Sequence, residues 1–518
     1  MSSVPRIAVV GGGASAVCLL DALARDGGVP PGEVVVFEPS GHLWRGRPYQ
    51  PDLPVVRVNA VPEDMSVRAG DTAHFADWLV SRTLLTSSAG AHRDPHSGAT
   101  FVPRAVFGDY LEQSARAALR SLVAAGWGVR IVRDHVVRAE ESGPDELVLG
   151  TSAGDAVTVD HAVLCFGAGT PVDVFGLAGT AGFVAEPYPT ASALARVAPD
   201  ADVVVIGSGL TAVDVVLGLD HLGHEGRIRL VSRRGVLPGV RQRPVHHRLR
   251  HFTPAHFRRI AATGGTVTLP EVVALMETEL NSVGEDLTPV RAEIAAMTRE
   301  DPVERLRRGL AEVDSPSIAL RVLQQAVPDA GPDVWPLLDE AARTWLMAEH
   351  DRTVMSLCCP MPPASAARLL ALAEAGRVEF VRGVTDVRAR PGGGFTVTAD
   401  GVESTAQVVV NAVNARLHRR SGAATPLLES LAAAGLAEPH PRGGVRVLRA
   451  TSELVTGGVA DPRLHALGDP ARGSLFFTFG VQSLVDRAVD IVESVRARWT
   501  TPALVPADRS DDDRLQLI

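Results

Sequence analysis

The sequence predicts an α/β fold built from two Rossmann-like units, with a helix-rich segment inserted in the second. Two observations carry this prediction. Residues 11–16, with the spacing G-x-G-x-x-A, directly follow an apolar β-branched run at 7–10 and open an Ala/Leu-rich helix. The same order recurs at residues 207–212, after the apolar run 203–206. A strand, a Gly-rich turn and a helix in this order are typical of dinucleotide binding.

Composition excludes several classes of protein. The 518 residues exceed one compact core, and 46% hydrophobic with 21% charged residues is ordinary for a globular protein. A net charge of −9 argues against a nucleic-acid partner. The sequence contains no lysine, so all 51 basic residues are arginines. A lysine Schiff base, a P-loop lysine and a kinase ATP-binding lysine are therefore excluded.

Cysteine use and hydropathy point to a reducing compartment. Four cysteines in this length do not form a disulfide framework, and no C-x-x-C motif is present. We find no signal-like start and no apolar stretch of membrane-spanning length. We therefore expect a cytoplasmic protein without a membrane partner. No metal-ligand spacing, catalytic triad or paired carboxylate motif stands out, and the oligomeric state is not indicated.

Each part of the first turn has a physical role. Gly11 permits the tight turn, Gly13 lets a pyrophosphate approach the backbone, and Ala16 lets the helix pack close to the strand. The helix N-terminus offers amide donors to the phosphate. The next strand, 34–37, ends at Glu38, 25 residues after Gly13, where a carboxylate can accept hydrogen bonds from a ribose diol.

The second turn lacks that acid. Its following strand, 228–231, leads into Ser232, Arg233 and Arg234. A carboxylate would repel a 2′-phosphate, whereas guanidinium groups pair with one bidentately. This unit should therefore prefer NADPH over NADH. The alternative is that these arginines are merely solvated at a strand end.

Two dinucleotide units in one chain imply hydride transfer between two cofactors. The first unit resembles the FAD half of two-dinucleotide flavoproteins. Residues 162–169 look like the strand and Gly-rich crossover that leave it, 408–414 like the crossover that returns, and 464–469 like the late strand whose Asp binds the ribityl chain. A helix starting near Gly480 would then direct its N-terminus at the flavin.

Further motifs resemble one broad family, the FAD/NAD(P)-binding oxidoreductases related to flavin-dependent N-hydroxylating and Baeyer–Villiger monooxygenases. Within it, the sequence is similar to a bacterial branch of largely unassigned proteins, some of them hydroxylases. The resemblance covers roughly two-thirds of the chain and indicates cofactors better than substrate. The motifs that carry it are residues 46–49 (GRPY), 58–62 (VNAVP), 65–66, 75–79, 102–104 (VPR), 107–111, 232–238 (SRRGVLP) and 472–476.

The turn motifs and the resemblance together imply a set of cofactor contacts. For FAD, they are Gly11, Gly13, Ala14, Ser15, Ala16, Glu38, Asn59, Met65, Ser66, Val136, Gly468, Asp469 and Thr478. For NADPH, they are Gly207, Gly209, Leu210, Thr211, Ser232, Arg233 and Arg234. Met65 has a simpler alternative, in which its loop only packs it into the core. The expected domains are 1–195 (FAD, first part), 196–405 (NADPH, with a helical insertion at about 245–347) and 406–518 (FAD return and tail).

The sequence also departs from the family pattern. Residues 351–363, which contain the adjacent Cys358 and Cys359, do not match it and leave the substrate open. Arg241 and Arg243 open a basic run that continues to His251. They could bind a substrate carboxylate or NADPH phosphates, or belong to a basic surface loop.

The leading functional hypothesis is an FAD-dependent, NADPH-consuming monooxygenase that acts through a flavin C4a-hydroperoxide. Its substrates are molecular oxygen and a small molecule, most plausibly an amine or an acidic amino acid that becomes N-hydroxylated. Hydroxylation of a heterocycle such as a purine comes next. A plain NAD(P)H–acceptor reductase and a non-catalytic flavin-bound sensor are the remaining alternatives.

Overall fold

A computed structural model describes residues 4–500 except 83–91, 168, 414–423 and 479. Ala168, Asn414 and the expected C-terminal tail thus lie outside the described residues. The first domain is built on a six-stranded sheet of order β16-β17-β7-β1-β2-β3, parallel except for the β16–β17 pair. Its strands are β1 (Arg6–Val10), β2 (Glu33–Phe37), β3 (Gly128–Val132), β7 (His161–Leu164), β16 (Glu453–Thr456) and β17 (Val459–Ala466).

The second domain has a five-stranded parallel sheet of order β11-β10-β9-β15-β8. Its strands are β8 (Phe183–Val184), β9 (Val203–Ile206), β10 (Ile228–Ser232), β11 (Val378–Arg382) and β15 (Val408–Asn411). The predicted α/β fold with two Rossmann-like units is confirmed. Because β8 and β15 pair within this sheet, the second domain begins before residue 195 and ends after residue 405, unlike the expected boundaries.

Two antiparallel three-stranded sheets accompany the main ones. One contains β4 (Val136–Gly143), β5 (Glu146–Thr151) and β6 (Ala156–Val159), the other β12 (Val384–Ala389), β13 (Phe395–Ala399) and β14 (Val402–Ala406). The helices of the two sheet domains are α1 (Ala14–Asp26), α2 (His74–Ser81), α3 (Arg104–Ala124), α4 (Thr190–Ala193), α5 (Leu210–His221), α14 (Thr425–Ala433), α15 (Arg472–Leu475) and α16 (Val481–Thr500). No described helix is long and apolar enough to cross a membrane.

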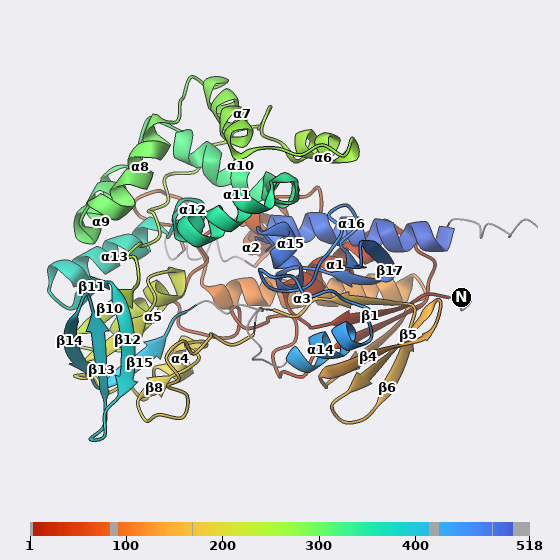
Figure 1. Cartoon of the computed structure of the whole chain (residues 1–518), viewed down its shortest axis with the longest axis horizontal. Coiled ribbons are helices and arrows are strands. Elements are labelled where there is room, and N and C mark those ends of the chain that lie inside the picture. The colour runs from red at the N-terminus through yellow and green to blue at the C-terminus, as the bar shows by residue number, and fades with distance from the viewer. Residues whose placement is uncertain (1–3, 83–91, 168, 414–423, 479, 501–518) are drawn as a thin grey trace, which may run out of the picture.

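The predicted helical insertion lies in the crossover from β10 to β11. It comprises α6 (Pro254–Ala262), α7 (Leu269–Asn281), α8 (Thr288–Arg299), α9 (Pro302–Ala311), α10 (Ala319–Val334), α11 (Glu340–Trp345), α12 (Asp351–Cys358) and α13 (Pro363–Glu374). It therefore extends past the expected end at residue 347. Figure 1 shows these green and teal helices reaching from the second domain toward α15 and α16 of the first, and α10 contacts both of those helices.

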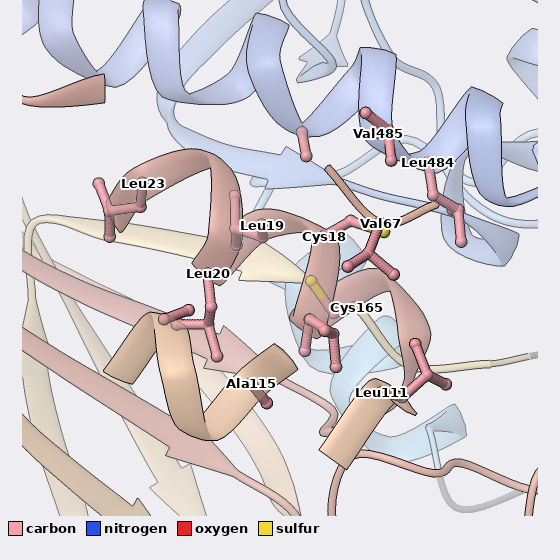
Figure 2. Packing of buried hydrophobic residues seen from close by; sticks show 14 of the residues in the cluster. Cys18, Leu19, Leu20, Leu23, Val67, Leu111, Ala115, Cys165, Leu484 and Val485 are labelled. Atoms are coloured by element: carbon pink, nitrogen blue, oxygen red, sulfur yellow. The ribbon is translucent and has the colours of Figure 1, made fainter. Parts of the chain in front are cut away.

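The core of the first domain packs around α1, the helix that follows the first Gly-rich turn. Helix α1 is held between α3 and α16, and Figure 2 shows Cys18 and Leu20 on α1 with Leu111 on α3 and Leu484 on α16. Burial of these apolar side chains supplies the main favourable term in folding. The helix that begins at the first Gly-rich turn is thus fixed on both sides.

Candidate functional site: two dinucleotide turns and the helical insertion

The first Gly-rich turn is closed by backbone contacts. Gly11 has φ +107°, and a Cβ there would lie 2.7 Å from the backbone nitrogen of Phe166. Only glycine fits this position, because both the conformation and the space exclude a side chain. Gly13 is the extended N-cap of α1 and has no side-chain cap, so the first amides of the helix point out without a side-chain acceptor.

Gly13 leaves room for a ligand. A Cβ built on it would have only Gly46 within 4 Å, at 3.6 Å from its Cα. Ala14 and Ser15 follow at the half-buried start of α1, while Ala16 is fully buried against the sheet, as its predicted packing role requires. This open, uncapped helix end fits a pyrophosphate.

Glu38 lies at the end of β2 and faces the same turn. Its Oε2 accepts a hydrogen bond from the Gly12 amide at 2.7 Å, and its Oε1 accepts one from the Ser40 amide at 2.9 Å. The carboxylate is therefore held in place by the backbone, and each oxygen keeps a lone pair for a further donor. This is the geometry expected of a positioned ribose acceptor.

The late strand returns to the first turn. Gly468 has φ +85°, and a Cβ on it would lie 2.7 Å from Oγ of Ser15. The adjacent Asp469 has its Oδ2 3.8 Å from the Cβ position of Gly167 in the crossover after β7. Three segments far apart in the sequence, each singled out from the sequence, thus meet at the N-terminus of α1.

Thr478 has a buried side-chain hydroxyl without a hydrogen-bond partner among the described residues. The residue is 1% exposed. Phe476, two residues earlier, has φ +60°, which is strained for a non-glycine residue, and its ring stacks on Trp335 of the insertion at 4.6 Å. An orphaned buried hydroxyl beside a strained backbone fits a bound cofactor at this point. Phe479 lies outside the described residues.

The loop after Asn59 is less open than expected. Met65 is 5% exposed and packs in the same core as α1 and α16, which favours its simpler alternative as a packing residue. Ser66 donates from Oγ to the Asp71 carbonyl at 2.6 Å and accepts from the Arg68 amide at 3.2 Å. Both side chains are therefore occupied within the domain, whereas Asn59 is half-buried.

Val136 lies at the start of β4, beside the end of β2. It is buried and belongs to the same apolar cluster as Phe37, the residue before Glu38. The Glu38 amide in turn donates to the Val132 carbonyl at 3.0 Å. Val136 therefore shares an apolar cluster with the residue that precedes Glu38.

The second turn repeats the geometry of the first. Gly207 has φ +123°, and a Cβ there would lie 2.8 Å from the carbonyl oxygen of Ala412. Gly209 is the extended, uncapped N-cap of α5, which begins at Leu210. Thr211, one residue on, hydrogen-bonds with its side chain to the phenol of Tyr188.

A residue that the sequence reading missed approaches this turn. A Cβ built on Gly209 would lie 3.5 Å from Nη1 of Arg352, on α12 of the insertion. Arg352 also donates from Nη2 to the Val236 carbonyl at 3.3 Å. No pattern in the sequence pairs position 352 with the turn, because the two meet only through the fold of the insertion.

The three residues after β10 have different environments. Ser232 accepts the Gly235 amide on its Oγ at 3.0 Å. Arg234 donates from Nη2 to the Ala348 carbonyl at 2.9 Å and pairs with the Glu349 carboxylate at 3.2 Å. Arg233 is exposed, and within the described ranges its guanidinium has no hydrogen-bond or ion-pair partner. Arg233 is therefore the better placed of the two arginines for a 2′-phosphate.

Arg241 and Arg243 do not act together. The Nε of Arg241 is buried without a hydrogen-bond partner, and burial lowers the pKa of its guanidinium, with partial compensation from the Asp64 carboxylate. Arg243 donates from Nε to Oδ1 of Asp314 at 2.5 Å and from Nη1 to the Ser97 carbonyl. Arg243 thus ties the insertion to the first domain, and Arg241 alone faces the interior.

Carboxylates gather where α10 of the insertion meets α16. Burial and the negative charges of Asp64 and Asp486 raise the pKa of Asp329 to about 7. One turn along α10, Asp333 pairs with Arg449 and with Arg258. Asp329, in contrast, has no arginine partner in the part of the chain that the structure describes. Burial also raises the pKa of Asp490, which pairs with Arg449 and Arg487, to about 7, so the raised pKa alone does not distinguish Asp329 within this cluster.

The adjacent Cys358 and Cys359 lie in an environment that disfavours their thiolate forms. Burial raises the pKa of the Cys359 thiol to about 11, although Arg241, Arg352 and Arg472 lie near it, and burial raises that of Cys358 further. All four cysteines are free. Within the described ranges, no group of three or more metal-ligating side chains could hold a metal ion.

Comparisons with known proteins agree with this geometry. Residues 8–169 match the family described as FAD-NAD(P)-binding, which confirms the predicted dinucleotide-binding unit at the first turn. No curated protein matches the sequence significantly.

Solved structures match nearly the whole chain at low identity. The structure of an ornithine N-hydroxylase from Kutzneria sp. 744 with reduced FAD, NADP⁺ and L-ornithine has a TM-score of 0.57 at 15% identity, covering 96% of this chain and 99% of its own. An FAD-bound cadaverine monooxygenase from Erwinia amylovora has 0.57 at 11%, covering 100% of both chains. An L-lysine 6-monooxygenase from Pseudomonas syringae has 0.55 at 14%, covering 96% and 100%.

These likenesses show the fold that the described residues adopt. The protein therefore carries an FAD/NAD(P)-binding domain at residues 8–169 within the fold of the flavin-dependent N-hydroxylating monooxygenases.

Proposed function

We propose that the protein is an FAD- and NADPH-dependent monooxygenase that N-hydroxylates a small amine. The observation that carries this proposal is the presence of two uncapped Gly-rich turns, at Gly13 and Gly209, in one chain with the fold of N-hydroxylating enzymes. Those neighbours are an ornithine N-hydroxylase, an L-lysine 6-monooxygenase and a cadaverine monooxygenase, and the compound named for each carries an amine.

In this proposal, the first domain holds FAD. The open N-terminus of α1 takes the pyrophosphate at Gly13, Glu38 takes the ribose, and the orphaned Thr478 hydroxyl donates to or accepts from the flavin. Bound FAD, once reduced, supplies the activation of molecular oxygen. Trp335 stacked on Phe476 keeps one approach to this region apolar and excludes water.

The second domain holds NADPH. The N-terminus of α5 and the Arg352 guanidinium lie together at Gly209, where two negative phosphates are best compensated. Arg233 is free to take the 2′-phosphate, whereas Arg234 fastens the insertion through Glu349. The insertion therefore takes part in forming the NADPH site as well as covering it.

The carboxylates between α10 and α16 favour a cationic amine as the substrate. Asp329, Asp64 and Asp486 place negative charge near one another without an arginine on Asp329. An ammonium group would be attracted there, and Asp329, with its raised pKa, suits the removal of a proton from an amine at neutral pH. Arg241 can bind a carboxylate on the same molecule. We therefore propose a basic amino acid or diamine rather than an acidic amino acid, because Arg243, which could otherwise bind a second carboxylate, is bonded to Asp314.

Product analysis with a panel of substrates tests the proposal. Purified enzyme with NADPH, oxygen and single amines, amino acids or purines is analysed by mass spectrometry for a gain of one oxygen atom. We expect an N-hydroxylated product from an amine and none from a purine. An oxygenated purine would favour the heterocycle alternative, and NADPH oxidation that yields only hydrogen peroxide with every compound would favour the acceptor reductase.

A further inference from the structure

A buried polar network joins the two domains behind the NADPH turn. Arg104, the first residue of α3 in the first domain, pairs with Asp214 on α5 of the second domain at 2.6 Å. Tyr188 donates from its hydroxyl to the same Asp214 oxygen at 2.5 Å. The side chains of Arg104 and Asp214 are only 14% and 9% exposed.

Two arginines of the first domain also contact the ring of Tyr188. The guanidinium of Arg104 lies 5.3 Å from the ring centroid and that of Arg47 lies 5.5 Å from it. Arg47 in turn donates to both oxygens of Glu186 at 2.8 and 2.9 Å. Tyr188 is thus held by Arg47 and Arg104. Each arginine lies in a sequence motif (residues 46–49 and 102–104) from which no cofactor contact is expected.

The contact extends to the short helix α4. Asp52 of the first domain accepts the amides of Thr190 and Ala191 at 2.8 Å each and the Thr190 hydroxyl at 2.6 Å. Val55, three residues further on, packs in the apolar core of the second domain. One loop of the first domain therefore caps α4, which itself contacts α5.

Folding stability alone does not explain the buried ion pair between Arg104 and Asp214. Bringing a charged pair out of water is costly, and an apolar pair of the same shape often serves stability equally well. What a buried, directional pair does supply is a single relative orientation of the elements that carry it. Here those elements are α3 and α5, and α5 carries Gly209 and Thr211 of the NADPH turn.

We propose that Arg104, Asp214 and Tyr188 form a positioning joint that fixes α5, and with it the bound NADPH, relative to the flavin. In this proposal the three residues act through α5, which carries the second Gly-rich turn. The proposal rests on the proposed function, because it assumes that hydride passes from NADPH on the second domain to FAD on the first.

The test removes both charges together, because a single substitution would leave one buried charge unpaired. The variant is Arg104→Gln/Asp214→Asn, and the matched control is Arg307→Gln/Glu374→Gln, an exposed ion pair between α9 and α13. Anaerobic rapid mixing with NADPH gives the limiting rate of flavin reduction and the apparent Kd for NADPH. We expect the limiting rate to fall at least tenfold while the Kd changes less than threefold and FAD content is unchanged.

A second measurement does not depend on the reaction. Hydrogen–deuterium exchange of the full-length enzyme should show faster exchange in the joint variant at 188–194 and at the start of α5, and not in the control. If the wild type is not reduced by NADPH, the proposed function fails, and exchange alone decides on the joint. A joint variant with wild-type exchange at both segments, or with a wild-type limiting rate of reduction, would overturn the positioning role.

Discussion

Arg233 should account for most of the preference for NADPH over NADH. Its guanidinium is exposed at the end of β10 without a partner in the described part of the chain, whereas Arg234 is held by Ala348 and Glu349. A charge-assisted guanidinium–phosphate pair contributes about 1.5–3 kcal/mol. Arg233→Ala should therefore raise the Michaelis constant for NADPH by about 10- to 150-fold and that for NADH by less than about twofold.

Steady-state oxidation of each cofactor at saturating oxygen gives both constants, and calorimetric titration with NADP⁺ checks binding apart from turnover. Arg234→Ala should have a smaller effect than Arg233→Ala, because the Arg234 guanidinium already donates hydrogen bonds to Ala348 and Glu349 of the insertion. Arg307→Ala, an exposed arginine on α9, serves as the control. An equal loss for NADPH and NADH in Arg233→Ala would refute the assignment of the 2′-phosphate to this residue.

Three further predictions concern the flavin, the substrate and stability. Gly13→Leu should yield folded protein without bound flavin, because the side chain would fill the phosphate approach; a yellow, fully loaded variant would contradict this. The Asp329 carboxyl, with a pKa raised to about 7, is neutral below that pH and ionised above it. The kcat/KM for an amine should therefore rise with pH through about 7, and Asp329→Asn should lower it and remove this step; a persistent step in the variant would show that another group titrates. His161 and His465 are buried, and burial lowers their pKa to about 4 and about 3 from 6.5. Below pH 6.5 the unfolded chain binds more protons, so the free energy of unfolding should fall as pH drops from about 6.5 toward 4; a value that is constant over this range in urea titrations would contradict the burial argument.

Local patterns predicted the fold well, because each Rossmann-like unit is specified over a short stretch. Gly11 and Gly207 could be recognised from spacing alone, and both prove to have positive φ at a crowded strand end. Glu38 could be placed in the same way, because it ends the strand adjacent to the turn. The apolar runs on either side of each turn predict the strands of the parallel sheet, and the position of the turn between strand and helix follows from those strands.

Contacts made by the insertion could not be predicted in this way. Arg352 reaches Gly209, and Asp329 reaches Asp64, across more than one hundred residues of intervening chain. Arg243 illustrates the same limit, because its partner Asp314 lies on a segment whose path no local pattern determines. Domain boundaries were misplaced for a related reason, since β8 is only two residues long and is defined by pairing with β15.

The proposed monooxygenase activity is tested most directly by the reaction of the reduced enzyme with oxygen. Enzyme reduced anaerobically with NADPH is mixed rapidly with oxygenated buffer, and the flavin spectrum is followed with and without ornithine, lysine or cadaverine. We predict a near-ultraviolet absorbing species that persists for seconds before oxidised flavin returns, and that decays faster with an amine substrate. Direct return to oxidised flavin with stoichiometric hydrogen peroxide, unchanged by any amine, would contradict the proposed function.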